Sequence, residues 1–399
     1  MSSHNTSSLH CDFCRRESLT AVYKPDGSTR GLTVYLCGHC GLMQSAPRIA
    51  RTADRHAAAV SGGADWGNVR YGKGFRTAIA LDAIARQSDM GTDLQLLDVG
   101  SNRGSFARAF LDAAPNAHIT AVEPDERFAQ SCGDLPRTDL IQARIENTTL
   151  PPERFDIVHS CHTIEHLAEP FAALKDHARV LKTGGILVLD APNIALIGGR
   201  DILEEWFIDK HLFHFSATTL GRMIEAAGFE ILCEPDPADD VNLLFVARKT
   251  GALPFPVNSS TFGDPMEVGI AQALIQRYQA TRLANLAALQ SAAAAIRALA
   301  PRRVALWGAG RLFDLLVREG GFDPSTLALL IDAHLQKHMD ERHGVMLSAP
   351  EALADVDAVI VMSRMFAGEI SKEVKMRVPG AEIILYADLL ESAKTRKAA

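Results

Sequence analysis

The sequence lacks an apolar run long enough to cross a bilayer. Its first eight residues are polar and contain no apolar core of the kind that a secretory signal peptide needs. It also lacks an excess of basic residues, because its formal net charge is −7, which gives no electrostatic reason to expect nucleic-acid binding. These absences predict a cytoplasmic protein that binds neither membranes nor nucleic acid.

The chain is poor in cysteine outside one short region. Three of its seven cysteines are scattered and are expected to be packed thiols: Cys132, Cys161 and Cys233. The other four form two Cys-x-x-Cys pairs on either side of a strand-like segment at residues 32–36: Cys11, Cys14, Cys37 and Cys40. Four thiolates at this spacing complete the closed tetrahedral shell of structural zinc, which leaves no position for catalysis. A redox pair or disulfides are the alternatives, and a reducing cytoplasm argues against disulfides.

Residues 96–106 predict a strand, a glycine-rich turn and the start of a helix. Asp98 lies near the end of the strand, and Gly100 and Gly104 let the backbone approach a ligand closely. A second acid, Glu123, closes the next apolar run at the interval at which an α/β nucleotide site places its ribose-binding carboxylate. An ordinary α/β domain with a glycine turn is the alternative, since the pattern is not G-x-G-x-x-G.

This arrangement resembles the S-adenosylmethionine (SAM) site of class I methyltransferases. Later landmarks of that family match residues 154–160, 164–167, 181–189 and 218–230. The resemblance implies that Asp98 supports the loop and that Glu123 binds the ribose. Arg144 stands where the family often has an acid near the adenine, so adenine recognition is expected to rest on backbone groups around Ile145. The predicted cofactor site consists of Asp98, Gly100, Ser101, Asn102, Gly104, Glu123, Pro124, Ile145 and Ser160.

The last hundred residues repeat the α/β pattern. Residues 303–311 predict a strand followed by a glycine turn, and residues 328–332 and 358–363 predict two further strands. Gly308 and Gly310 follow the first strand, and Asp332 ends the second, so these residues either hold a nucleotide or only pack. Phe313 occupies the position of the third glycine in a dinucleotide fingerprint, and NAD is therefore not expected.

A long helix is predicted from Pro265 to Leu299, where the chain is rich in alanine and leucine and has no internal proline. We favour a linker helix over a dimer helix. The length of 399 residues allows two or three domains with their own cores. The predicted α/β protein has a zinc ribbon at 1–46, a Rossmann-like methyltransferase domain at 47–250, a linker with the long helix at 251–300 and a second Rossmann-like domain at 301–399.

This order of parts resembles the three-domain sugar C-methyltransferases, which act on nucleotide-linked keto-deoxysugars. The resemblance implies a base that removes a proton beside the ketone, after which the enolate carbon attacks the SAM methyl group. A histidine suits that role because its pKa lies near neutrality. His211 falls on a histidine of the family, although Asp209 and Lys210 replace the histidine and glutamate that often stand before it. Tyr71 matches a tyrosine that closes over SAM or the substrate in the family. The alternative for His211 is a structural histidine that orders its loop, and the alternative for Tyr71 is ordinary packing at the entry of the domain.

Other histidines and other functions remain open at this stage. His162 and His166 follow the fourth strand, where they either face the acceptor or, together with Glu165, order the helix start. One alternative function is methylation of an oxygen or nitrogen of another small metabolite. Another is a zinc-ribbon scaffold with a degenerate SAM domain, against which the intact loop and acids argue. The expected partner is a small-molecule acceptor, and the protein is expected to be a monomer or homodimer.

Overall fold

The computed structural model describes residues 9–25, 28, 30–48, 73–197, 206–207, 211–239, 242–251, 262–337, 339–363 and 366–390. Tyr71 and the polar stretch 51–56 lie outside these residues. The chain forms two compact units, and the described residues from 9 to 275 belong to the first and those from 276 onward to the second. The ribbon-like part and the SAM-site part thus share one unit, and the finer four-part division stays a prediction.

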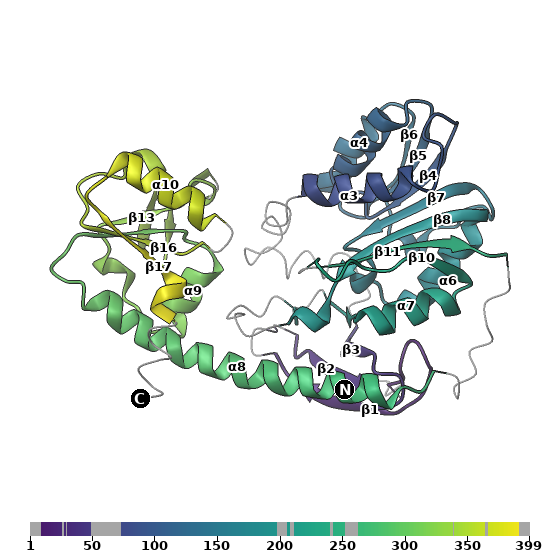
Figure 1. The fold of residues 1–399 in the computed structure, drawn as a ribbon. Coiled ribbons are helices and arrows are strands. Elements are labelled where there is room, and N and C mark those ends of the chain that lie inside the picture. Colours follow the sequence, from purple (N-terminus) through teal and green to yellow (C-terminus); the bar gives the residue numbers. More distant parts are fainter. Residues whose placement is uncertain are drawn as a thin grey trace, which may run out of the picture. The chain divides into compact units, whose positions relative to one another are not determined.

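A four-stranded antiparallel sheet contains the cysteine-rich segment (Figure 1, purple). Its strands are β1 (Leu19–Tyr23), β2 (Thr33–Cys37), β3 (Met43–Ala46) and, from much later in the chain, β9 (Phe213–His214). The predicted strand at 32–36 is confirmed as β2. The ring of Phe13 packs on that of Phe171 with centroids 5.3 Å apart, and the Asp12 carboxylate accepts the backbone N–H of Phe171 at 3.0 Å. These contacts fix the turn at Asp12 and Phe13 to the helix at Pro170–Val180, which packs on the larger sheet.

A seven-stranded mixed sheet forms the centre of the first unit, in the order β10-β11-β8-β7-β4-β5-β6. The five strands from β8 to β6 are parallel, and β11 and β10 are antiparallel additions at one edge. The strands are β4 (Gln95–Val99), β5 (His118–Val122), β6 (Thr138–Ile141), β7 (Phe155–Cys161), β8 (Leu181–Pro192), β10 (Phe229–Cys233) and β11 (Asn242–Lys249). This is the doubly wound architecture of α/β nucleotide-binding domains.

Helices cover both faces of this sheet (Figure 1). On one face lie α3 (Lys73–Ala85), α4 (Ser105–Ala113) and α5 (Glu126–Gly133), and on the other lie α6 (Pro170–Val180) and α7 (Ala217–Ala226). Successive residues of a strand point to opposite faces. Leu96 and Ile157 therefore join the core cluster beneath α4, whereas Leu97 and Val158 join the cluster beneath α6 and α7.

The second unit has its own six-stranded sheet, in the order β14-β15-β13-β12-β16-β17, which is parallel except for β14. Its strands are β12 (Val304–Trp307), β13 (Leu329–Ile331), β14 (Glu341–Arg342), β15 (Val345–Ser348), β16 (Ala358–Val361) and β17 (Glu382–Leu385), with helices α9 (Arg311–Arg318) and α10 (Ala367–Arg377). The Asp332 carboxylate accepts the backbone N–H groups of Ala309, His334 and Leu335 at 2.9–3.1 Å. Asp332 thus stabilises the turn that contains Gly308 and Gly310, because it binds the N–H group of Ala309 between them.

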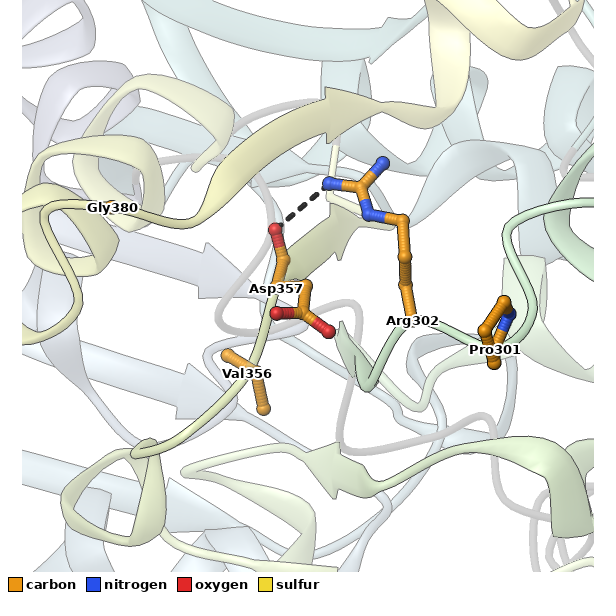
Figure 2. Close-up of a pocket in the computed structure, with 5 residues that line it drawn as sticks. All are labelled: Pro301, Arg302, Val356, Asp357 and Gly380. Carbon is orange, nitrogen blue, oxygen red and sulfur yellow. Dashed lines mark hydrogen bonds between the residues drawn. The ribbon is translucent and has the colours of Figure 1, made fainter.

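A pocket of the second unit lies at the edge of that sheet where its parallel strands begin, opposite the edge that carries Asp332 (Figure 2). Its lining residues precede β12, β16 and β17: Pro301, Arg302, Val356, Asp357 and Gly380. The Arg302 guanidinium donates to the carbonyl oxygen of Asp357 at 2.9 Å and pairs with Glu382 at 2.7 Å. Ligands of α/β sheets bind at the carboxyl ends of the strands, and this pocket is therefore not a candidate nucleotide site.

The predicted long helix is confirmed as α8 (Pro265–Arg297). Its N-terminal residues belong to the first unit, where the Glu267 carboxylate accepts a hydrogen bond from Ser216 Oγ at 2.5 Å. Among the described helices, none combines the length and the apolar character that a membrane span requires.

Two buried histidines make the first unit sensitive to acid. Burial lowers the pKa of His177 to about 4 and that of His214 to about 3. An unfolded histidine binds its proton near pH 6.5, so below that pH the unfolded state holds more protons than the folded state. Each histidine therefore stabilises the fold above pH 6.5 and costs about 1.4 kcal/mol per pH unit as the pH falls from there toward its folded pKa.

We expect His177→Leu to reduce the acid-induced loss of stability. Leucine keeps the buried volume of the side chain and removes the proton uptake of the unfolded state. The slope of unfolding free energy against pH should fall by about 1.4 kcal/mol per pH unit between about pH 6 and pH 4.5. Urea unfolding at several pH values measures this slope, and equal slopes for the variant and the parent protein would contradict the account.

Candidate active site

The site lies where the strand order of the seven-stranded sheet reverses, at the carboxyl ends of β4 and β7. Strands β4 and β7 are adjacent and parallel, while the chain continues from β4 to β5 on one side and from β7 to β8 on the other. The loops after two such strands diverge and leave a crevice in which ligands of α/β proteins bind. The predicted residues Gly100 and Ser160 lie at this edge of the sheet on the two strands.

The glycine loop has the left-handed conformation for which glycine is suited. Gly100 has a φ of +75° and Gly104 a φ of +73°, and Gly104 directly precedes α4. A Cβ atom at residue 100 would overlap with Oγ1 of Thr163, in the loop after β7. The backbone N–H of Gly100 donates to the carbonyl oxygen of Val122 at 2.8 Å. Both the dihedral angles and the close approach of the two loops therefore require glycine at position 100.

Glu123 joins the end of β5 to the glycine loop. Its carboxylate accepts the backbone N–H of Asn102 at 2.7 Å and that of Asp125 at 2.8 Å. Burial raises the pKa of this carboxyl, and the two N–H groups oppose the rise. Asn102 also has a positive φ of 52°, which is uncommon for a residue with a side chain. Glu123 thus holds the loop in shape from the position predicted for the ribose-binding acid.

Asp98 is paired with a histidine that the sequence did not single out. Nδ1 of His159, on β7, lies 2.7 Å from Oδ1 of Asp98, and the His159 ring stacks on Phe106 with centroids 3.5 Å apart. Asp98 Oδ2, Ser101 Oγ and Ser160 Oγ are buried and find no hydrogen-bond partner within the described parts of the chain. Buried polar atoms of this kind ordinarily bind a ligand or water, and these fit the polar methionine end of SAM.

Two further predicted residues lie in the connections after β5 and β6. Pro124 follows Glu123 directly, and Ile145 begins the short 3-10 helix η1 (Ile145–Asn147), where it packs against the core. The Arg144 guanidinium is held by the Glu146 carboxylate through two contacts of 2.8 Å. The Arg144 charge is therefore compensated within the chain, and the adenine contact through the backbone at Ile145 stays a prediction.

A third strand-end acid, which the sequence analysis missed, lies beside the crevice on β8. Asp190 Oδ2 accepts a hydrogen bond from Arg76 Nε at 2.8 Å, and Arg76 also pairs with Asp239. The Cys161 thiol, at the end of β7, lies 3.6 Å from the same Asp190 oxygen. The signal was present, since Asp190 closes an apolar run in the same way as Asp98 and Glu123.

The histidines that the sequence analysis singled out gather around the short helix η2 (Ile164–His166), which His162 precedes and to which His166 belongs. His162 Nδ1 and His166 Nε2 lie 3.5 and 3.6 Å from Oε1 of Glu165. The rings of His166 and His211 have centroids 5.0 Å apart, although 45 positions separate these residues along the chain. The structure thus brings His211 to the histidines after β7.

The four cysteines form one buried cluster. Their sulfur atoms all lie within 4.8 Å of one another, with 3.5 Å between Cys11 and Cys40 and 3.6 Å between Cys14 and Cys37. Zinc–thiolate bonds of about 2.3 Å in a tetrahedron place sulfurs slightly less than 4 Å apart. The cluster therefore suits the predicted structural zinc, which would be held by Cys11, Cys14, Cys37 and Cys40.

We expect Gly100→Ala to weaken SAM binding at least about tenfold, because the alanine methyl group would push the loops of β4 and β7 apart. Gly184→Ala is the matched control, since Gly184 has a φ of +84° but no atom within 4 Å of its would-be Cβ. Both variants carry the backbone strain of about 1–2 kcal/mol, and only the first should lose affinity. Equal SAM affinity of the two variants, by calorimetry, would show that close packing at Gly100 is unimportant.

A family model described as a methyltransferase domain matches residues 73–234. A methyltransferase of unknown specificity from Mycobacterium leprae is 33% identical over 131 residues, which make up 30% of this chain and 48% of that protein. A probable SAM-dependent methyltransferase from Mycobacterium tuberculosis is 31% identical over 140 residues, or 35% of this chain and 49% of that protein. The chain thus spans about half the length of the curated relatives it matches.

Solved structures to which the chain is similar include a putative SAM-dependent methyltransferase from Listeria monocytogenes, which is 18% identical over 43% of this chain and 98% of that one, with a TM-score of 0.35. The family model begins with α3, contains the glycine loop, Glu123 and the histidines after β7, and ends just after β10. Residues 73–234 of the first unit therefore form a methyltransferase domain that is similar to SAM-dependent methyltransferases.

Proposed function

We propose that this chain transfers the methyl group of SAM to a small-molecule acceptor. The observation that carries the proposal is the glycine loop at the strand-order reversal, held by the Glu123 carboxylate through Asn102. Asp98, Ser101 and Ser160 offer buried polar atoms to the methionine end, and Glu123 offers its carboxylate to the ribose. Bound SAM supplies an electrophilic methyl group on a sulfonium, and the site contributes mainly by aligning the acceptor with it.

We propose further that the acceptor is a nucleotide-linked keto-deoxysugar and that the methyl group goes to a carbon atom. The order of a cysteine-rich sheet, a methyltransferase domain and a second parallel sheet supports this, as do the histidines beside the loop. Nδ1 of His211 lies 3.0 Å from the carbonyl oxygen of Trp206. A carbonyl only accepts, so Nδ1 carries the hydrogen and Nε2 the lone pair. That lone pair either removes the acceptor proton or binds a cation that acidifies it.

The zinc that we propose for the four-cysteine cluster has a structural role. The cluster belongs to the same core as Phe13 and Phe171, and β3 of this sheet pairs with β9, directly after His211 and Leu212. Zinc there would therefore help to hold β9, the strand that directly follows His211 and Leu212, in its position. Tyr71, the cytoplasmic location and the oligomeric state stay as predicted from the sequence.

The test is product analysis with 13C-methyl-labelled SAM and dTDP- or UDP-linked keto-deoxysugars. The proposal expects labelled carbon bonded to a ring carbon of the sugar, which the 13C chemical shift distinguishes from an O-methyl or N-methyl group. A label on oxygen or nitrogen would keep the methyltransferase and overturn the C-methylation. SAM binding without transfer to any sugar nucleotide would overturn the sugar acceptor, and the absence of SAM binding would favour a non-catalytic scaffold.

A further inference from the structure

Glu165 is a buried carboxylate without the hydrogen bonds that such a group requires. Its side chain is 2% exposed, and neither of its oxygens accepts a hydrogen bond from the described part of the chain. A buried charge is costly unless it is paired or binds a metal ion. The described ion-pair partners of Glu165 are His162 and His166, whose ring nitrogens lie 3.5 and 3.6 Å from Oε1, too far for a normal hydrogen bond. Glu165 is the central residue of the three-residue helix η2, which lies in the connection between β7 and α6, and its side chain is buried rather than part of a surface acidic cluster.

Two imidazoles complete a set of three ligand atoms around this carboxylate. One atom each from Glu165, His166 and His211 lies within 4.8 Å of the other two. The backbone fixes the group, because the N–H of Leu212 donates to the carbonyl oxygen of Glu165 at 2.8 Å and thereby ties the His211 segment to η2. His162 lies on the other side of the same carboxylate oxygen, at 3.5 Å.

His211 has the orientation that a metal-ligating histidine usually has. Its Nδ1 is directed at the Trp206 carbonyl oxygen at 3.0 Å, which selects the tautomer with the lone pair on Nε2. Metal-bound histidines typically donate their second N–H to a backbone carbonyl or a carboxylate in this manner. The same hydrogen bond holds the ring in place without a metal.

We propose that Glu165, His166 and His211 bind one divalent transition-metal ion. Two imidazoles and one carboxylate with further positions left open suit Mn²⁺, Fe²⁺, Co²⁺ or Zn²⁺, whereas Mg²⁺ and Ca²⁺ prefer oxygen ligands alone. This site is separate from the four-cysteine cluster, whose four thiolates would fill all four coordination positions of a zinc ion. The open positions are those that water and the acceptor would take.

The position of the site suggests what the ion would do, and this part rests on the proposed methyl transfer. Thr163, directly before η2, touches the glycine loop, and its hydroxyl donates to the carbonyl oxygen of Val99 at 3.2 Å. An acceptor oxygen bound to the ion would therefore lie next to the SAM loop, where the ion polarises it and acidifies the adjacent C–H or O–H group. A ligated His211 cannot also accept the proton, so in the metal proposal a hydroxide on one of the open positions of the ion would accept it and become water.

The test uses Mn²⁺ as the probe, on full-length protein loaded with one equivalent of Zn²⁺ per chain, which the four thiolates bind in preference to a site of nitrogen and oxygen ligands. Thiolates favour zinc over manganese, so added Mn²⁺ reports on the nitrogen and oxygen ligands. Electron paramagnetic resonance of free Mn²⁺ should show one bound ion per chain, and Glu165→Gln and His166→Ala should each weaken binding at least about tenfold. His118→Ala is the control, because His118 is exposed at the start of β5 and should leave binding unchanged.

SAM affinity is measured on the same samples to separate this proposal from the proposed function. Retained SAM binding with lost Mn²⁺ binding in Glu165→Gln is the expected result. No Mn²⁺ binding by the parent protein, or equal binding by all four proteins, would overturn the metal site and return the base role to His211. Failure of the parent protein to bind SAM would count against the methyltransferase function, whatever the metal does.

Discussion

Replacing Glu123 with alanine should weaken SAM binding by a factor of at least about 100. A carboxylate that binds two ribose hydroxyls contributes two hydrogen bonds to a charged group, each of about 1.5–3 kcal/mol. The loss extends beyond the ribose, because Glu123 also accepts the N–H of Asn102 at 2.7 Å and so holds the glycine loop. Equilibrium dialysis with labelled SAM measures the affinity directly.

The matched control is Glu126→Ala, three residues further on. Glu126 is exposed in the first turn of α5, so this variant removes a carboxylate close to the site without touching the loop. Glu123→Gln should fall between the parent protein and Glu123→Ala, because an amide keeps one accepting oxygen for the loop N–H. An affinity of Glu123→Ala within twofold of Glu126→Ala would show that SAM does not bind at this acid.

Replacing Cys37 with serine should release the zinc and lower the melting temperature by about 10 °C or more. Structural zinc sites contribute on the order of 10 kcal/mol to the folding of small domains. A loss of even 4 kcal/mol lowers the melting temperature by about 2–4 °C per kcal/mol in a domain of this size. The damage should reach the active site, since β3 of this sheet pairs with β9 next to His211.

The control for this variant is Cys233→Ser, because Cys233 is exposed on β10 and outside the cluster. It should retain zinc, melting temperature and activity. Metal analysis after dialysis against a chelator and thermal unfolding of both variants give the comparison. A metal content and stability of Cys37→Ser equal to those of Cys233→Ser would mean that the four cysteines do not form a zinc site.

The local parts of this structure could be predicted because their signals are local. The strand, turn and helix around Gly100 follow from an apolar run, glycines and helix-forming residues within eleven positions. The same holds for β2 between the cysteine pairs and for α8, where a long alanine-rich segment allows little besides a helix. In each case the residues that decide the conformation are neighbours along the chain.

The side-chain pairs of the site could not be predicted, because they join residues far apart in sequence. Asp98 meets His159 across 61 positions, and Arg76 meets Asp190 across 114. Their contact depends on which strands become neighbours in the sheet, and periodicity within one strand does not encode that order. The pairing of β3 with β9, which brings the cysteine-rich sheet to the residues after His211, is of the same kind.

The most direct test of the central claim is a calorimetric titration of the full-length, zinc-loaded protein with SAM. The account predicts one SAM per chain, with a dissociation constant on the order of micromolar and an affinity that Gly184→Ala retains and Glu123→Ala loses. Binding that both variants retain would place SAM elsewhere in the molecule. A titration that shows no binding at any temperature tried would contradict the methyltransferase function.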